Sequence, residues 1–211
     1  MPAVEHIDAI KRLAPRTLID VGANKGQFSL IVRHLFPHVE IEAFEPLESE
    51  SAIYRSALGP SARLHALALG HIAADVPFFV ASRADSSSLL PLGAAQSAAY
   101  GVQTKAMIRV PVARLSDILD LSSLPRPILL KLDVQGGELD VLKGAAAALP
   151  AINFIYCEAS FVRLYDGQPL AAEIIGYLLT QGFELRGVFN QSLTKKFGPT
   201  QADFLFESTE R

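Results

Sequence analysis

The sequence predicts an α/β fold, in which helices cover a doubly wound, mostly parallel sheet of seven strands. Short apolar runs rich in β-branched residues alternate with segments whose apolar residues recur at helical spacing. A glycine-containing turn, residues 22–26, joins the first such strand to the first such helix. Several strands end in an acidic residue, and open α/β sheets bind their ligands at the carboxyl ends of their strands.

Length and composition predict one domain that spans residues 1–211. The chain is 50% hydrophobic and carries a formal net charge of −3, which is enough apolar material for a real core. It has no Lys/Arg cluster that would indicate nucleic-acid binding, and its lone Cys157 excludes an internal disulfide framework. No apolar run is long enough to span a membrane, and residues 1–15 lack a signal-peptide core. We therefore expect a cytoplasmic protein without a membrane span, and a homodimer is possible.

The first elements follow from hydrophobic spacing. Apolar residues three or four apart predict an N-terminal helix within residues 1–15. Residues 17–21 form a short apolar strand, the glycine turn follows, and residues 28–35 continue as a helix that Pro37 closes. The order strand, tight turn, helix brings backbone N–H groups to the end of the first strand.

The second strand, residues 38–45, ends in Glu45. A carboxylate at this point, about twenty residues after a glycine turn, can accept hydrogen bonds from two ribose hydroxyls. A helix over residues 48–58 and a third strand over residues 63–69 follow. Small apolar side chains near the end of that strand, such as Ala68, would lie against an adenine ring.

The regular alternation breaks between residues 70 and 127. Residues 76–81 and 107–112 are predicted strands, and the polar segment between them is too long for an ordinary connection. We interpret the interval as a hairpin insertion between strands 3 and 4 that covers the site; a surface loop without ligand contact is the alternative. Residues 116–121 are predicted as a short helix capped by Ser116.

The remaining elements are a fourth strand over 127–134, a helix after it, a fifth strand over 152–158, a helix over 170–178, and strands over 183–189 and 202–207. The fifth strand ends in Glu158. The last two strands are joined by a short connection that contains Gly198 and Pro199, which favours an antiparallel pair at the sheet edge.

The glycine turn has an unusual spacing. It runs D-x-G-x-N-x-G, from Asp20 through Gly22 and Asn24 to Gly26. A dinucleotide turn reads G-x-G-x-x-G and a P-loop ends in G-K-[ST], and neither pattern fits. An acid at the strand end, Asp20, suits a ligand with positive groups, such as S-adenosylmethionine, which carries an ammonium and a sulfonium.

Two motifs carry a family resemblance. The D-x-G-x-N-x-G turn resembles motif I of class I methyltransferases, specifically the D-V-G-A-N-x-G form of the FkbM family. The second motif is K-x-D-V-x-G-x-E, from Lys131 through Asp133 to Glu138, which resembles the FkbM signature around the fourth strand. The family often has Glu where this chain has Gln135 and often Ala where it has Gly137. The resemblance extends from residue 17 to the C-terminus.

The resemblance implies a Rossmann-like, class I methyltransferase fold and a cytoplasmic enzyme (EC 2.1.1.-) that uses S-adenosylmethionine. It implies O-methylation of a hydroxyl on a sugar, a glycan or a secondary metabolite. The serine-rich patch of the family matches residues 86–88, and we assign Ser87 and Ser88 to the substrate. The residues that we assign to the cofactor are Asp20, Gly22, Ala23, Asn24, Gly26, Gln27, Phe28, Glu45, Pro46, Ala68 and Asp133.

An alcohol acceptor must lose its proton, so the site needs a base. The candidates are Asp133 and Glu158, although Asp133 could bind the cofactor's ammonium instead. Lys131, the third residue assigned to catalysis, lies among apolar strand residues and should pair with a carboxylate, because a lone buried charge is costly. Asp133 and Glu158, with Glu138, could also hold Mg²⁺; no tight acidic cluster is present, so magnesium is possible but not expected.

Two other functions remain open. One is an NAD(P)-dependent oxidoreductase on a Rossmann sheet, against which the turn spacing and the absence of a Tyr-x-x-x-Lys pair argue. The other is a cofactor-binding module without activity. The presence of Asp20, Gly22, Glu45 and Asp133 argues against that alternative.

Overall fold

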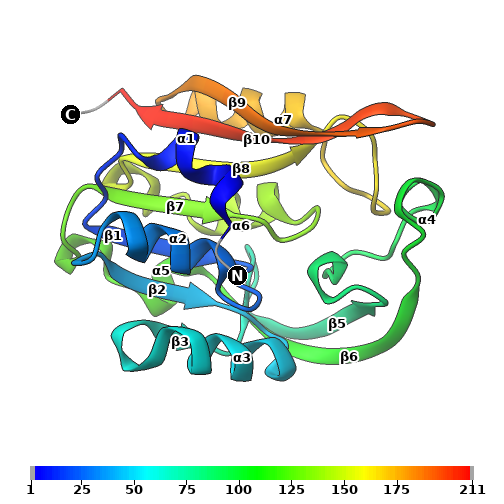
Figure 1. The fold of residues 1–211 in the computed structure, drawn as a ribbon, viewed down its shortest axis with the longest axis horizontal. Helices are drawn as coiled ribbons and strands as arrows, with labels where there is room; N and C mark the ends of the chain where they lie inside the picture. Colours follow the sequence, from blue (N-terminus) through cyan, green and yellow to red (C-terminus); the bar gives the residue numbers. More distant parts are fainter. Residues whose placement is uncertain (1–2, 210–211) are drawn as a thin grey trace.

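The computed structural model describes residues 3–209, so the outermost two residues at each end of the predicted domain, including the first two of the predicted N-terminal helix, lie outside the described residues. A seven-stranded sheet in the order β3-β2-β1-β7-β8-β10-β9 forms its centre (Figure 1). The strands are β1 Thr17–Val21, β2 Glu40–Phe44, β3 Arg63–His65, β7 Ile128–Leu132, β8 Phe154–Ser160, β9 Phe183–Thr194 and β10 Gly198–Ser208. Only β10 runs antiparallel to its neighbours, β8 and β9. This is the doubly wound α/β sheet that the sequence predicts.

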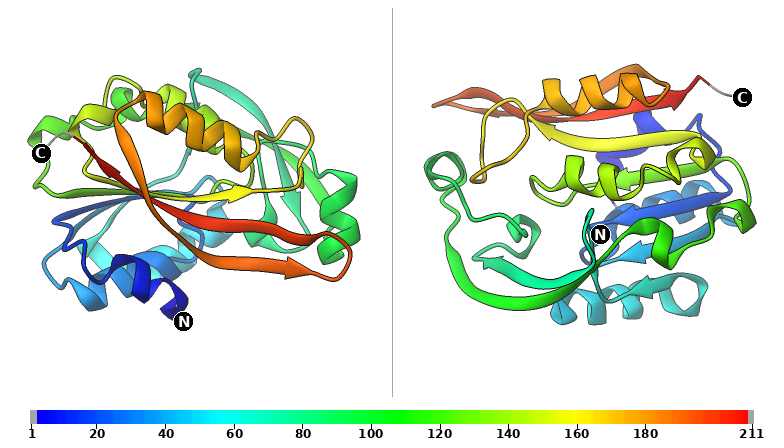
Figure 2. Two further views of the ribbon diagram at one scale, coloured as in Figure 1. Left: turned by 90° about the horizontal axis from the view of Figure 1, so that it is seen from above. Right: turned by 180° about the vertical axis from the view of Figure 1, so that it is seen from behind.

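Helices cover both faces of this sheet (Figure 2). On one face lie α1 Ile7–Ile10, α2 Gln27–Leu35 and α3 Glu48–Leu58; on the other lie α6 Glu138–Gly144 and α7 Ala171–Thr180. Successive residues of a strand point to opposite faces, so Leu18 and Ile19 of β1 belong to two separate apolar cores. The N-terminal helix is shorter than predicted, because a 3-10 turn precedes α1 and Ala14 has a φ of +44°.

A second, three-stranded sheet lies beyond the carboxyl ends of the parallel strands (Figure 1). It contains β4 Ala68–Leu69, β5 Ala74–Ala81 and β6 Thr104–Ala113 in the order β4-β6-β5. The predicted third strand is therefore divided between two sheets: β3 pairs with β2, and β4 pairs with β6. The division falls at a tight turn, where the Leu67 N–H donates to the His65 carbonyl.

The interval between residues 70 and 127 is more elaborate than a hairpin. Strands β5 and β6 are antiparallel, but the chain between them first pairs again with β5 at Ser88 and then forms helix α4 Ala94–Tyr100. Helix α5 Leu115–Ile118 begins one residue before Ser116, so Ser116 is not its cap.

Gly198 and Pro199 belong to β10, not to its connection with β9. Short 3-10 turns lie at Val4–His6, Gly59–Ser61, Ala84–Ser86, Leu121–Ser123 and Leu149–Ala151.

The contact between α6 and the end of β4 gives a test of the packing that positions the second sheet. A Cβ at Gly144 would lie 2.1 Å from the Gly70 carbonyl oxygen, so we expect Gly144→Ala to lower the free energy of unfolding by about 1–3 kcal/mol. Gly176 in α7 has no atom within 4 Å of such a Cβ, and Gly176→Ala should raise it by about 0.5–1 kcal/mol. Urea denaturation measures both; equal stability of the two variants would contradict the packing.

Candidate active site

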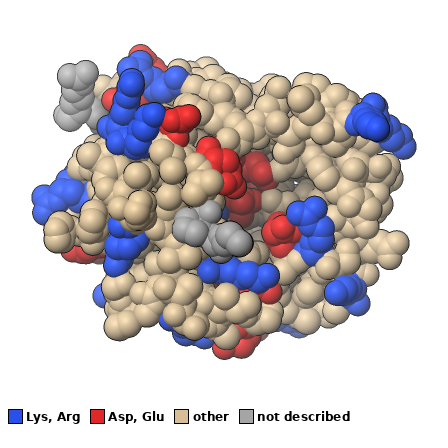
Figure 3. All heavy atoms as spheres, in the orientation of Figure 1, with Lys and Arg blue, Asp and Glu red and all other residues tan. Residues whose placement is uncertain are grey.

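A cavity of about 350 Å³ opens at the carboxyl edge of the large sheet, and acidic side chains gather in the central hollow of this face (Figure 3). Its size lies in the range of small-molecule sites. The turn after β1, the ends of β2 and β7, the second sheet and the N-terminal segment contribute its walls. Of the residues assigned to the cofactor or substrate from the sequence, those that line it are Gly22, Ala23, Asn24, Gln27, Phe28, Glu45, Pro46, Ala68, Ser87 and Asp133.

The glycine turn lets β1 and β7 end close together. Gly22 has a φ of +74°, and a Cβ on it would lie 1.9 Å from the Asp133 carbonyl oxygen, so only glycine permits this approach. Gly26 also has a positive φ, but it packs against Leu58 and Tyr54 and does not line the cavity. It is the N-cap of helix α2, and its contact with a ligand stays a prediction.

Glu45 lies where the sequence predicts a ribose-binding acid. Its two carboxylate oxygens accept the backbone N–H groups of Asn24 at 2.9 Å and Leu47 at 2.8 Å. Each oxygen keeps a further lone pair for a ligand. Burial raises the pKa of Glu45 to about 6, so the carboxylate is ionised at neutral pH and becomes protonated under mildly acidic conditions.

Asp20 does not line the cavity, contrary to the prediction from the sequence. It is fully buried, accepts a hydrogen bond from Ser29 Oγ at 2.6 Å, and forms an ion pair with Lys131 Nζ at 3.1 Å. Burial acts to lower the pKa of Lys131, but the carboxylates of Asp20 and Asp133 outweigh it and the net shift is upward. Lys131 Nζ also donates to the Gly22 carbonyl at 2.9 Å. The predicted pairing of the lysine is confirmed, and the pair holds the glycine turn.

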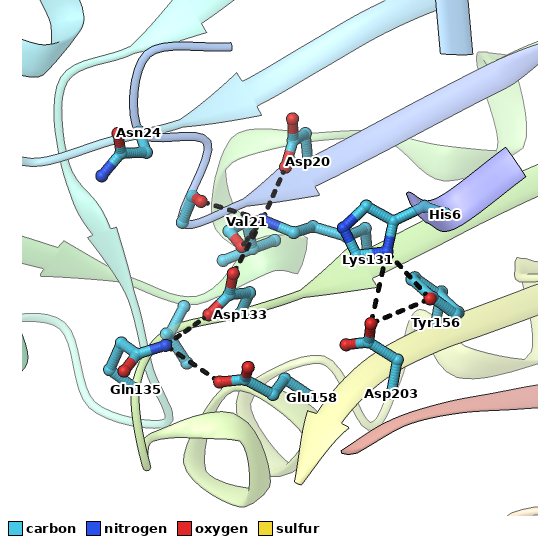
Figure 4. Close-up of polar contacts among 12 residues, drawn as sticks. His6, Asp20, Val21, Asn24, Lys131, Asp133, Gln135, Tyr156, Glu158 and Asp203 are labelled. Atoms are coloured by element: carbon cyan, nitrogen blue, oxygen red, sulfur yellow. Dashed lines mark hydrogen bonds and ion pairs between the residues drawn. The ribbon is translucent and has the colours of Figure 1, made fainter. Parts of the chain in front are cut away.

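Two further acids are joined by an amide (Figure 4). Gln135 Nε2 donates to Asp133 Oδ1 at 2.7 Å and to Glu158 Oε2 at 2.9 Å, and its Oε1 accepts from the Tyr165 hydroxyl at 2.7 Å. Asp133 lines the cavity, whereas Glu158 does not. Burial and the neighbouring Asp133 raise the pKa of Glu158 well above its usual range. The residue that looked like a departure from the family pattern is thus what keeps two acids together.

Glu138 stabilises the loop before α6. Its Oε1 accepts the backbone N–H groups of Val134 at 3.1 Å and Gly136 at 3.0 Å, and burial raises its pKa to about 7. Across residues 3–209, no group of three or more His, Cys, Asp or Glu side chains is arranged to hold a metal ion.

The serine hydroxyls in the segment after β5 are largely used within the protein. Ser87 Oγ accepts the Ala81 N–H at 3.0 Å, although Ser87 also lines the cavity. Ser88 is buried, does not line the cavity, and donates to the Gln135 carbonyl at 2.7 Å. The serine patch therefore attaches β5 to the loop that carries Gln135, and the predicted contact of Ser88 with a substrate is not supported.

Sequence reasoning missed a cluster at one end of the cavity. His6, Tyr156 and Asp203 all line it, and His6 Nδ1 lies 2.9 Å from the Tyr156 hydroxyl and 3.2 Å from Asp203 Oδ2. These residues come from the N-terminal segment, β8 and β10. No local motif relates positions so far apart in the chain, and only the pairing of β10 with β8 brings two of them together.

Comparison with known proteins identifies the family. Residues 20–185 match the family described as the Methyltransferase FkbM domain. The chain belongs to the FkbM methyltransferase family. This confirms the family and the S-adenosylmethionine-dependent methyltransferase class predicted from the sequence.

In residues 3–209, no helix has the length and apolar character needed to cross a bilayer.

Individual relatives are more distant. The chain is 29% identical over 165 residues to the 2-O-methyltransferase NoeI of Sinorhizobium fredii. This alignment covers 74% of this chain and 68% of NoeI. It is 29% identical over 79 residues to the hexuronic acid methyltransferase AglP of Haloferax volcanii, covering 37% of this chain and 33% of AglP. The crystal structure of methyltransferase FkbM from Methylobacillus flagellatus superposes with a TM-score of 0.59 at 16% identity, covering 90% of this chain. The matched region is 43% of that protein, so this chain spans less than half of it. The superposition confirms the class I methyltransferase fold.

The buried pair between β1 and β7 gives a second prediction. Asp20→Asn should lower the free energy of unfolding by about 3 kcal/mol, because Lys131 is left buried without its close counter-ion. Adding Lys131→Met should restore part of the loss, since the uncompensated charge is then gone. Glu48→Gln, which removes an exposed pair with Arg55, is the control and should change stability little. Chemical denaturation of these three variants and the wild type tests this; a double variant no more stable than Asp20→Asn would contradict it.

Proposed function

We propose that this protein transfers the methyl group of S-adenosylmethionine to a hydroxyl oxygen of an uncharged sugar. The observation that carries the proposal is the charge of the cavity. Its lining holds five carboxylates, Glu5, Glu45, Asp85, Asp133 and Asp203, and one lysine. That lysine, Lys131, is already paired with Asp20.

This charge distribution suits a cationic nucleoside. The ammonium and sulfonium of S-adenosylmethionine outnumber its carboxylate, so an acid-lined cavity attracts it. A pyrophosphate carries two negative charges and would face carboxylates without a free cation to bind it. The geometry therefore supports S-adenosylmethionine over NAD(P), the alternative considered from the sequence.

The residues present fit the parts of this cofactor. Glu45, oriented by two backbone N–H groups, is suited to the ribose hydroxyls. Ala68, with Leu47 and Phe78, offers an apolar wall for adenine. Asp133 lies beside Gly22, with its side chain 41% exposed, and is suited to the cofactor's ammonium. We assign Lys131 to the glycine turn, because its closest contacts are to Asp20 and to turn carbonyls, with Asp133 Oδ2 farther away at 3.9 Å.

The acceptor class rests on the relatives and on charge. NoeI is described as a 2-O-methyltransferase and AglP as a hexuronic acid methyltransferase, which supports a sugar acceptor here. Carboxylates that line the cavity would repel a uronate, however, and this favours a neutral sugar. Bound S-adenosylmethionine supplies an electrophilic methyl on a good leaving group. The chain must hold the acceptor oxygen near that methyl and exclude water, and such positioning is worth about 7–11 kcal/mol.

Cofactor choice and acceptor class are tested on the purified protein. S-adenosylhomocysteine at a hundred times its Kd should raise Tm by about 5–10 °C, and NAD(P)H should not. With labelled S-adenosylmethionine, a panel of neutral methyl glycosides and hexuronic acids should yield labelled ethers from the neutral members. Stabilisation by NAD(P)H alone would overturn the methyltransferase assignment. Faster labelling of uronates would overturn the acceptor class only.

The ionisation of Glu45 gives a further prediction. Because its pKa is raised to about 6, affinity for S-adenosylhomocysteine should fall as the pH drops through 6 and the carboxylate loses its charge. Glu45→Gln should bind more weakly at pH 8 and lack this component of the pH dependence. Glu48→Gln, on the exposed side of α3, is the matched control. Calorimetric titration between pH 5 and 8 measures the effect, and identical pH profiles for wild type and Glu45→Gln would contradict the role.

A further inference from the structure

His6 is held at the cavity wall by aromatic rings and by a hydrogen-bonding network. Its ring lies edge-on to Phe28 at 5.3 Å and to Tyr156 at 5.5 Å between centroids. Phe28 and Tyr156 stack on each other at 5.7 Å. The imidazole therefore sits in one orientation beside the cavity, although it comes from a short 3-10 turn near the start of the chain.

The network around Nδ1 bears on which ring nitrogen carries the proton. Asp203 Oδ2 accepts from the Tyr156 hydroxyl at 3.0 Å and lies 3.2 Å from His6 Nδ1. Asn190 Nδ2 also lies 2.9 Å from Nδ1, but it donates to Asp203 Oδ2 at 2.8 Å and to the Tyr156 hydroxyl at 3.1 Å, and these two acceptors use both of its hydrogens. Burial, with Asp203, raises the pKa of Tyr156 above its usual range, so this phenol remains a donor. An anionic oxygen beside Nδ1 favours the tautomer with its hydrogen on Nδ1. The lone pair is then on Nε2.

Nε2 is the free end of the ring. It lies on the side opposite Tyr156 and Asp203 (Figure 4), and no hydrogen bond joins it to another residue of the described part of the chain. The charged or titratable groups around the imidazole are Glu5, whose Oε1 is 3.8 Å from Nε2, Tyr156 and Asp203. The Lys131 ammonium lies over the Phe28 ring, 5.8 Å from its centroid.

We propose that His6, aligned by Asp203, is the base that takes the proton from the acceptor hydroxyl. This inference rests on the proposed function. As the acceptor oxygen forms its bond to the methyl carbon, the carbon–sulfur bond breaks and its electron pair stays on sulfur, which becomes a neutral thioether. The hydroxyl proton moves to Nε2. The products are a methyl ether, S-adenosylhomocysteine and an imidazolium stabilised by Asp203, which later returns the proton to water.

The two acids predicted as bases fit this role less well. Glu158 does not line the cavity, and both Asp133 and Glu158 hold the amide of Gln135. Each of these carboxylates therefore already has an oxygen that accepts a hydrogen from that amide. His6 keeps an unshared lone pair at the cavity and has a second partner that orients it, which is the geometry of an oriented base.

The first test needs no acceptor. In protein labelled with ¹⁵N-histidine, the His6 signal is assigned by its loss in His6→Gln. We expect neutral His6 to have its hydrogen on Nδ1, and Asp203→Asn to shift the population toward Nε2–H while the other histidines are unchanged. A wild-type His6 with its hydrogen on Nε2 would have no lone pair on Nε2 to accept the acceptor's proton, and that result would overturn the proposal.

The second test measures turnover on an acceptor found among the methyl glycosides. His6→Gln should lower kcat about 10²–10⁴-fold, with the Kd for S-adenosylhomocysteine unchanged by calorimetry. It should also lose the fall in kcat at acid pH. Asp203→Asn should lower kcat less, and His34→Gln, at the exposed end of α2, should match wild type. Normal kcat in His6→Gln would overturn the base and leave methyl transfer intact. Binding of S-adenosylhomocysteine without labelling of any acceptor would count against the proposed function instead, and the tautomer would still test His6.

Discussion

The ion pair between Lys131 and Asp20 is the constraint on which the site depends. Parallel pairing of β1 with β7 sets these two residues opposite each other, and both are buried. Neither charge could remain in the sheet without the other. Together they fix the glycine turn, because the same ammonium donates to the carbonyls of Val21 and Gly22. The carboxyl ends of β1 and β7 are thus held side by side, with Asp133 next to the turn.

That pairing also sets the charge of the cavity. Because Asp20 neutralises Lys131, the remaining charged groups that a ligand meets in the cavity are carboxylates. Glu45 follows β2 and Asp133 follows β7, the two strands that flank β1. Asp203 lies on β10, next to β8. Burial raises the pKa of Glu45 and of Glu158, because an ionised carboxylate is costly to bury. A cation completes the balance, which is why a cationic cofactor suits this fold.

The sequence predicts the parts that depend on neighbouring residues. Hydrophobic spacing predicts the sheet and its main helices, and α3 Glu48–Leu58 has the predicted bounds. The two glycine-containing motifs identify the turn and the β7 end, because each motif is contiguous. The role of Asp20 was different from the prediction, since a strand-end acid reads the same whether it faces a ligand or a buried lysine. The division of the third strand depends on β6, which lies far away in the sequence, and no local pattern reports it.

The cluster of His6, Tyr156 and Asp203 was missed for the same reason, because its residues are far apart in the sequence. His6, Tyr156 and Asp203 meet only because β10 inserts antiparallel beside β8 and the N-terminal segment crosses that face of the sheet. Two of the three side-chain contacts of Gln135 also join distant parts of the chain, one to Glu158 of β8 and one to Tyr165. A glutamate at that position would bring a third carboxylate against Asp133 and Glu158 and would require another proton or a cation there. The amide removes that requirement. Asp133 thereby keeps its place beside the turn, while the proton-accepting role belongs, in the proposed mechanism, to His6.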